Sequence, residues 1–130
     1  MAPAENNAES LLVRARRAAE RAYCPYSTFR VGATVRCDVG TVIHCCNVEN
    51  VSYRQSICSE RVALFSAISQ GKKPIELAVS CIDAQSDAAQ GSRKPCCACR
   101  QVIQELLPNK ANVSIGCGHK ATRTTPSCSL

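Results

Sequence analysis

The sequence predicts an α/β fold in which helices pack on a mixed β-sheet. Residues 30–37 and 41–47 each alternate apolar and polar side chains, and the turn residues between them favour a hairpin. The segment 75–83 is apolar almost throughout, which indicates a strand covered on both faces. It lies between two segments with helical periodicity, so we expect helices to pack on the sheet.

The first two helices are predicted from apolar spacing and from their end signals. The first is expected to be capped by Asn7 or Ser10 and to end before Pro25. The residues that recur at helical spacing in it are Leu11, Ala15, Ala18 and Ala22. The second is expected to begin near Cys58 and to stop at Gly71, and its apolar side chains lie almost all round, which is typical of a buried helix.

A third helix and a further strand complete the predicted elements. The helix ends at Pro108. Its buried face follows the i, i+3, i+4, i+7 pattern in Cys99, Val102, Ile103 and Leu106. Residues 111–117 read as a strand, whereas 116–128 show only weak strand character. The predicted order is therefore helix, hairpin, helix, strand, helix, strand.

The composition is that of one compact domain, residues 1–130, with residues 1–10 as a loose lead-in. The chain has 130 residues, of which 45% are hydrophobic, and its first ten residues lack the apolar run of a secretory signal. No later segment reaches the apolar length of a membrane span. We therefore expect a cytoplasmic protein that makes no contact with a membrane.

The net charge and the cysteine content narrow the class of partner. A formal charge of +6 is compatible with nucleic acid, but the chain has no Trp and only three Tyr and two Phe, so base stacking is not expected. Eleven cysteines in a chain without an export signal are typical of reduced thiols and metal ligands. Their odd number also excludes complete pairing.

Two of the predicted helices begin at cysteines, one at Cys58 and the other at the run 96–99. A helix N-terminus favours thiolate, the form that binds metal. The C-x-x-C spacing alone is equally compatible with a redox pair, and a fourth Cys or His ligand would make a zinc site purely structural. The upstream segment CSER adds an acid that is not itself a ligand. C-x-E followed by P-C-x-x-C is the signature of zinc-dependent deaminases.

Four segments together resemble one family. They are AYCPYSTFRVGA (22–33), CNVEN (46–50), CSER (58–61) and PCCACRQVI (95–103). In order and separation they resemble the small all-cysteine cytidine deaminases over about residues 11–115. The resemblance implies a three-layer α/β/α cytidine-deaminase-like fold, with a mixed sheet of about five strands and helices on both faces. It also implies one zinc ion per subunit and a homotetramer whose neighbouring subunits complete each active site.

The resemblance implies that Cys58, Cys96 and Cys99 hold the zinc ion. Three thiolates give such a site a net charge of minus one, which weakens its Lewis acidity, so a positive group is needed nearby. We expect Arg61 to supply it by hydrogen-bonding the thiolates. Glu60 would take a proton from a water molecule that zinc activates, pass it to ring N3 during attack on C4, and later protonate the departing ammonia. The alternative for Glu60 is an ordinary helix N-terminal acid.

The resemblance also implies contacts to the substrate from residues before the second helix. Asn47 and Glu49 would hydrogen-bond the ribose, and Phe29 would contact the pyrimidine. Val51 or its backbone would approach the substrate from a neighbouring subunit. The alternatives are a polar strand end for Asn47 and Glu49, and an ordinary core residue for Phe29.

Other residues near these motifs are not expected to serve the site. His44, on an alternating strand, is expected to lie in the sheet or toward solvent. Cys97, at the second position of C-x-x-C, is expected to point away from the metal. The family has an aromatic residue near its C-terminus that packs over the substrate, and TTPSCSL contains none. We expect either a site that is closed differently or a chain that ends early.

The predicted function is hydrolytic deamination of free cytidine and deoxycytidine to uridine and deoxyuridine with release of ammonia, a reaction of pyrimidine salvage. One alternative is deamination of a cytosine nucleoside antibiotic such as blasticidin S, although Asn47 and Glu49 suit ribose hydroxyls better. Two further alternatives are a protein that edits or binds nucleic acid, and a zinc-stabilised interaction module without activity.

Overall fold

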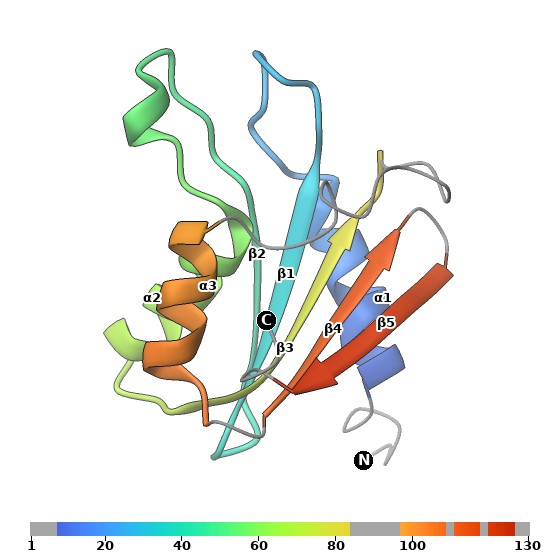
Figure 1. Ribbon diagram of the computed structural model, residues 1–130, viewed down its shortest axis with the longest axis vertical. Helices are drawn as coiled ribbons and strands as arrows, with labels where there is room; N and C mark the ends of the chain where they lie inside the picture. Colours follow the sequence, from blue (N-terminus) through green and yellow to red (C-terminus); the bar gives the residue numbers. More distant parts are fainter. Residues whose placement is uncertain (1–7, 84–96, 109–110, 118–119, 127–130) are drawn as a thin grey trace.

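The structure is a computed structural model of residues 1–130 and describes residues 8–83, 97–108, 111–117 and 120–126. The elements in chain order are α1 (Ala8–Ala19), β1 (Val31–Cys37), β2 (Val42–Cys46), the 3-10 helix η2 (Tyr53–Gln55), α2 (Ser59–Ser69), β3 (Pro74–Cys81), α3 (Cys97–Leu106), β4 (Asn112–Cys117) and β5 (Lys120–Pro126). Figure 1 shows the strands as one twisted sheet with helices on both of its faces.

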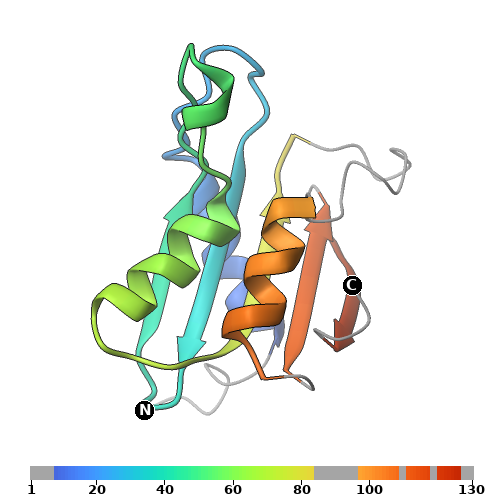
Figure 2. The same ribbon diagram turned by 60° about the vertical axis from the view of Figure 1, so that its left-hand side comes forward.

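The sheet has five strands in the order β2-β1-β3-β4-β5. β1 pairs antiparallel with both β2 and β3, β3 pairs parallel with β4, and β4 pairs antiparallel with β5. Figures 1 and 2 show α1 on one face of the sheet and α2 beside α3 on the other. The α/β/α arrangement and the five strands confirm the predicted fold class.

The larger apolar core lies between the sheet and the layer formed by α2 and α3. Alternate side chains of the strands point into it because successive residues of a strand face opposite sides of the sheet. Its fully buried members include Leu64, Leu77, Ile103 and Val113. This packing holds α2 and α3 side by side, so that both helices begin near the same end of the sheet (Figure 2).

The opposite face of the sheet accommodates α1 through small side chains. The backbone of α1 passes so close to β1 that a Cβ atom at Gly32 would lie 1.8 Å from the carbonyl oxygen of Ala15 and 2.6 Å from the nitrogen of Ala19. Leu11 and Leu12 pack against Ala78 of β3 on this face. Close approach between backbones therefore replaces the interlocking of large side chains seen on the other face.

The end of α1 and the strand β5 differ from the sequence-based prediction. The apolar spacing extends to Ala22, whereas α1 ends at Ala19 because residues 20–22 tighten into turns whose amide groups bond the carbonyl three residues earlier. β5 forms where the sequence has only weak strand character, because it pairs along its length with β4. Long-range pairing decides that strand rather than its own pattern.

The prediction that α2 is buried on all sides is wrong. Only one side of this 11-residue helix faces the sheet, and the side chains of Phe65 and Ile68 are 47% and 48% exposed. An apolar sequence without a helical stripe does not say which side packs. None of the helices in the part of the chain that the structure describes combines the length and the apolar character that spanning a membrane requires.

Candidate functional site

The candidate site lies at the start of α2, where the sequence placed the first thiol. Cys58 is the N-cap residue of α2, with extended backbone angles and no hydrogen bond from its side chain to the helix. Its sulfur lies at the positive end of the helix dipole, where the thiolate form is favoured. Cys99 lies in the first turn of α3 and is fully buried.

Arg61 connects the two thiols. Its Nη2 donates to the sulfur of Cys58 at 3.8 Å and to the carbonyl oxygen of Ser56 at 3.5 Å. Burial lowers the pKa of Arg61, but interactions with the thiols of Cys58 and Cys99 raise it by a larger amount, so the net shift is upward. A guanidinium that is always charged thus donates to the sulfur of Cys58, and its role beside zinc-bound thiolates stays a prediction.

Glu60 is buried beside the same thiols, with only 5% of its surface exposed. Its Oε1 accepts a hydrogen bond of 2.9 Å from the hydroxyl of Ser59. Burial raises the pKa of the Glu60 carboxyl and the nearby Cys58 thiol raises it further, while contacts with Ser59 and Cys99 oppose the rise. A carboxyl whose pKa is raised holds a proton more readily than an exposed glutamate does, which suits a group that must both accept and return a proton.

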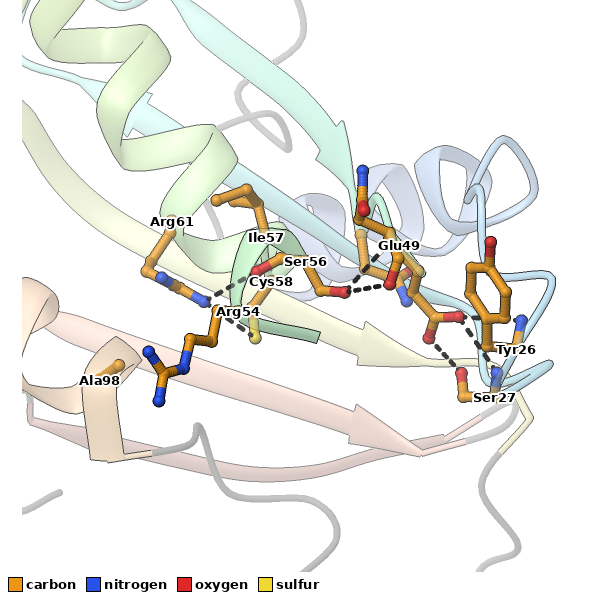
Figure 3. Close-up of a pocket in the computed structure, with 11 residues that line it drawn as sticks. Tyr26, Ser27, Glu49, Arg54, Ser56, Ile57, Cys58, Arg61 and Ala98 are labelled. Carbon is orange, nitrogen blue, oxygen red and sulfur yellow. Dashed lines mark hydrogen bonds between the residues drawn. The ribbon is translucent and has the colours of Figure 1, made fainter. Parts of the chain in front are cut away.

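A pocket of about 790 Å³ opens beside Cys58 and Arg61, and Glu60 is not among the described residues that line it. The other lining residues are Tyr26, Ser27, Asn47, Glu49, Asn50, Arg54, Ser56, Ile57 and, from α3, Ala98. Figure 3 shows Glu49 with Tyr26 and Ser27 at one end of the pocket and Cys58 with Arg61 at the other. The pocket is large enough for a small organic molecule.

Glu49 closes the end of the pocket that is far from the thiols. Its Oε1 accepts hydrogen bonds from the backbone amides of Tyr26, at 3.2 Å, and Ser27, at 3.1 Å. Its Oε2 accepts a short hydrogen bond from the hydroxyl of Ser27. The hydroxyl of Ser27 holds the pKa of Glu49 below its usual value, even though burial acts in the other direction. Glu49 is therefore ionised at neutral pH and orders the loop that carries Tyr26.

Asn47 joins two backbone segments beneath the pocket. Its Nδ2 donates to the carbonyl oxygen of Phe29 at 3.0 Å, and its Oδ1 accepts from the amide of Val31 at 3.0 Å. The side chain is buried and also lines the pocket. Because an amide NH₂ has two donors, one proton is left for another acceptor.

Phe29 and Val51 are placed differently from the other predicted contacts. Phe29 is half-buried against Val31 and Cys81, where it serves as packing. Val51 is 81% exposed on the loop before η2. Neither is among the described residues that line the pocket of this single chain. Their contacts with substrate stay predictions.

The thiols described here fit part of a zinc site. Cys58 and Cys99 supply sulfur donors on two neighbouring helices, with a cation between them. The buried Nε of Arg61 has no hydrogen-bond partner among the described residues, and a further anionic sulfur would satisfy it. The third predicted ligand, Cys96, lies outside the described residues, as does the side chain of Cys97. Within the described ranges no three His, Cys, Asp or Glu side chains converge on one point.

Sequence reasoning missed several residues of the pocket wall. Arg54, in η2, lines the pocket, and Figure 3 shows its side chain at the end where Cys58 lies. Tyr26 and Ser27 also line the pocket, although the segment 22–33 that contains them predicted no role for either. The hydroxyl of Ser56 accepts a hydrogen bond from the amide of Asn50 at 2.9 Å and so shapes the loop between them. No spacing rule picks out such loop residues, because only the folded loop brings them together.

Known proteins are similar to this chain both in sequence and in fold. A family model of the cytidine and deoxycytidylate deaminase zinc-binding region matches residues 5–115. A cytidine deaminase from Sporosarcina psychrophila is 41% identical over 98 residues, which is 75% of this chain and 68% of the relative. The crystal structure of cytidine deaminase from Burkholderia pseudomallei superposes with a TM-score of 0.84 at 36% identity, covering 95% of this chain and 94% of that one.

A deaminase of an antibiotic is also related, at lower identity. Blasticidin-S deaminase from Bacillus cereus is 32% identical over 98 residues, which is 73% of this chain and 69% of the relative. The family model covers most of the chain, including the described helix starts with Cys58, Glu60 and Cys99. On these findings the chain belongs to the cytidine and deoxycytidylate deaminase family and carries its zinc-binding region.

Proposed function

We propose that this protein is a zinc-dependent cytidine deaminase that converts free cytidine and deoxycytidine to uridine and deoxyuridine with release of ammonia. The observation that carries the proposal is the pocket of about 790 Å³ lined by Cys58 and Arg61, with the buried Glu60 between them in the first turn of α2. The relatives named above, at 41% and 36% identity, support the same substrate.

Zinc is held, in this proposal, by Cys58, Cys96 and Cys99, with one ion in each subunit. When bound there, zinc supplies an activated water molecule and a Lewis acid for attack on the ring. Arg61 offsets the charge of the thiolates, because its Nη2 already donates to Cys58 at 3.8 Å. Without that cation the negative charge of the thiolates would be left uncompensated, which costs free energy.

Glu60 moves the proton. Its raised pKa means that the carboxylate holds a proton more readily than an exposed glutamate does. It accepts a proton from the water, donates it to N3 of the pyrimidine, and then assists the departure of ammonia from C4. The hydroxyl of Ser59, which donates to Oε1 at 2.9 Å, keeps the carboxylate in one orientation during these transfers.

The nucleoside lies with its sugar toward Asn47 and Glu49. Both residues line the pocket, and Asn47 keeps one amide proton for a ribose hydroxyl after its two backbone contacts. The Glu49 carboxylate shares its oxygens with Ser27 and accepts from a hydroxyl on the remaining lone pairs. Phe29 contacts the pyrimidine in this proposal, after a shift from its packed position against Val31.

A homotetramer completes the site. Val51 is 81% exposed on the loop before η2, where it is accessible to a neighbouring subunit. On α2 the apolar side chains of Phe65 and Ile68 are about half exposed, which is unfavourable unless another surface covers them. We further propose that residues 1–130 act as one domain, in the cytoplasm, in pyrimidine salvage, without nucleic acid or membrane.

The test is Glu60→Gln, measured as ammonia release from cytidine and deoxycytidine together with bound zinc per chain. Since proton transfer by a positioned carboxylate contributes about 10²- to 10⁴-fold, the variant is expected to lose activity by that factor while it keeps one zinc ion. The matched control is Glu105→Gln, which makes the same change at an exposed glutamate on α3 and should keep full activity.

Three results would refute the proposal. A wild-type protein that holds one zinc ion per chain but releases no ammonia from either nucleoside is not a cytidine deaminase. A protein that releases ammonia from blasticidin S but not from cytidine acts on the antibiotic instead. Full activity in Glu60→Gln would show that the proton is carried by another group.

A further inference from the structure

A second pocket lies on the opposite side of the sheet from the candidate active site. It measures about 480 Å³ and is formed between α1 and β2. The lining residues with ionisable side chains, apart from two cysteines, are Arg14, Arg17, Arg21 and His44. We call this cavity the basic pocket.

The register of the hairpin places the basic pocket on the α1 face. His44 pairs with Thr34 and Cys46 pairs with Gly32, the residue whose Cα faces the backbone of α1. The thiols of the candidate site belong instead to α2 and α3, which cover the other face (Figure 2). No residue lines both pockets among those described. The basic pocket is therefore a separate feature of the molecule.

The positive charges of the basic pocket are concentrated on one side of α1 and the turn after it. Arg14 and Arg17 are three residues apart on α1, and Arg21 lies in the turn that follows the helix. No carboxylate is among the described residues that line the cavity. Like charges so close together repel one another.

His44 lies among the positive charges of this pocket. Burial lowers the pKa of His44, and the charges of Arg14 and Arg21 lower it further. The imidazole is therefore neutral at pH 7 and keeps one N–H donor. The positive charges of Arg14 and Arg21, seven residues apart, therefore both act on the imidazole of His44.

The helix dipole explains only part of this arrangement. Cations are favoured in the last turn of a helix, and this accounts for Arg17. It does not account for Arg14, one turn earlier, or for His44 on the neighbouring strand. Their convergence on one concave surface needs another reason, and complementarity to an anion is the simplest one.

We propose that the basic pocket binds a phosphate-bearing small molecule through its polyphosphate group. Arginine is suited to phosphate because its planar fork donates two parallel hydrogen bonds to one group. None of the described lining residues is Phe, Tyr or Trp, so a nucleobase has no large aromatic side chain on which to stack and the phosphates carry the recognition. The ligand class is inorganic polyphosphate or the polyphosphate tail of a nucleotide.

The proposal does not depend on the deaminase activity. Binding is measured by calorimetry with tripolyphosphate and, separately, with a nucleoside triphosphate, on the full chain at low salt. One anion per chain is expected to bind saturably. Arg17→Gln with Arg21→Gln is expected to weaken binding roughly tenfold for each arginine removed, because a hydrogen bond to a charged group is worth at least that factor.

The matched control removes the same charge elsewhere. Lys72→Gln with Lys73→Gln changes two cations in the loop before β3 and should leave the affinity within about twofold of wild type, a change small enough to attribute to long-range charge. Arg17→Lys with Arg21→Lys keeps the charge but loses the fork and should bind with intermediate affinity. Thermal unfolding gives a second readout. The anion should raise Tm by the same amount in the wild type and in the Lys72→Gln, Lys73→Gln control, and by less in the variants of Arg17 and Arg21.

The two ligand sources are separated by comparing the anions. Equal affinity for tripolyphosphate and the nucleoside triphosphate assigns the site to the phosphates alone, and tighter binding of the triphosphate assigns it to nucleotides. The proposal is overturned if neither anion binds saturably. It is also overturned if the Lys72→Gln, Lys73→Gln control weakens binding as much as Arg17→Gln with Arg21→Gln. It is also overturned if only single-stranded DNA binds, with a steep salt dependence, because that is the behaviour of a nucleic-acid surface.

Discussion

The packed core and the polar rim of the pocket are held together in different ways. We define the rim as residues 23–30, 47–57 and 82–83. The core joins the sheet to α2 and α3 through fully buried apolar side chains such as Leu64 and Leu77. The rim has few such contacts and is joined by hydrogen bonds, among them the backbone pair between Val48 and Ile57 at 3.0 and 2.8 Å.

This difference separates stability from function. Burial of apolar area is the dominant favourable term in folding, so changes in the core should lower the free energy of unfolding most. The rim positions Glu49 and Asn47 around the pocket, and a change there should disturb binding more than stability. The following variants test that division, from the largest expected effect on stability to the smallest.

Gly32→Ala is expected to have the largest effect. The added Cβ would lie 1.8 Å from the carbonyl oxygen of Ala15, so α1 must move away from β1. We expect a loss of more than about 3 kcal/mol in the free energy of unfolding, measured by urea denaturation. Gly40→Ala is the control, because a Cβ there meets nothing within 4 Å and only its positive φ of 87° costs energy. Equal losses in the two variants would contradict the close approach of α1.

Leu64→Ala should cost about 3 kcal/mol, because it leaves a cavity between α2 and the sheet. The same urea titration measures it. Phe65→Ala is a matched control on the same helix, since Phe65 is half exposed in the single chain. A larger cost for Phe65→Ala than for Leu64→Ala would mean that another surface covers Phe65, as in the proposed tetramer.

Asn47→Ala tests the rim. It removes the two hydrogen bonds by which the Asn47 side chain holds the carbonyl oxygen of Phe29 and the amide of Val31, so two partly buried backbone groups lose a partner. We expect a loss of about 2 kcal/mol in stability and a larger loss in kcat/KM for cytidine than that change in stability alone would cause. A variant with normal kcat/KM at a temperature where it is folded would leave Asn47 with a structural role only.

Asp83→Asn should have the smallest effect, and that effect should depend on pH. Asp83 accepts hydrogen bonds of 3.0 and 2.8 Å from the Arg30 side chain and one of 2.8 Å from its amide. The Arg30 side chain holds the pKa of Asp83 below its usual value of about 4. A depressed pKa in the folded state stabilises the protein above the unfolded pKa, and this stabilisation is lost as the pH falls through the folded pKa.

The variant should therefore be less stable than wild type at pH 7, and the difference should shrink below about pH 4 as the wild-type carboxylate is protonated. Urea titrations at pH 7 and at pH 3 measure it. Because the Arg30 and Asp83 side chains are partly exposed, the effect at neutral pH should be small and should decrease with salt. A difference that stays constant between the two pH values would exclude the ion pair as its cause.

The local parts of this molecule were predictable. Residues 31–37 and 42–46 form the expected hairpin, and α2 begins next to Cys58 as expected, because side-chain alternation and capping act over a few residues. The contact of Arg61 with Cys58 follows from their spacing of three residues on one helix start. Local rules failed at β5, whose own residues specify a strand only weakly.

The long-range parts were not predictable from residue patterns. The sequence does not say that Glu49 holds the Tyr26 loop, that Arg54 lines the pocket, or that Arg21 lies beside β2, because each pairing joins segments that meet only after folding. The exposed side of α2 is a similar case, since an apolar helix has no pattern that marks its free face.

By itself, the sequence determined the order of helices and strands from α1 to β4, the thiols at two helix starts and the acid that follows Cys58 by two residues. Periodicity and spacing carry that information along the chain. The tertiary structure decided that the start of α2 lies beside α3, that Glu49 and Arg54 line one pocket with Cys58, and that α1 touches β1 at Gly32. The physical reason is that packing of the sheet against α2 and α3 brings their first turns together, which no local pattern records.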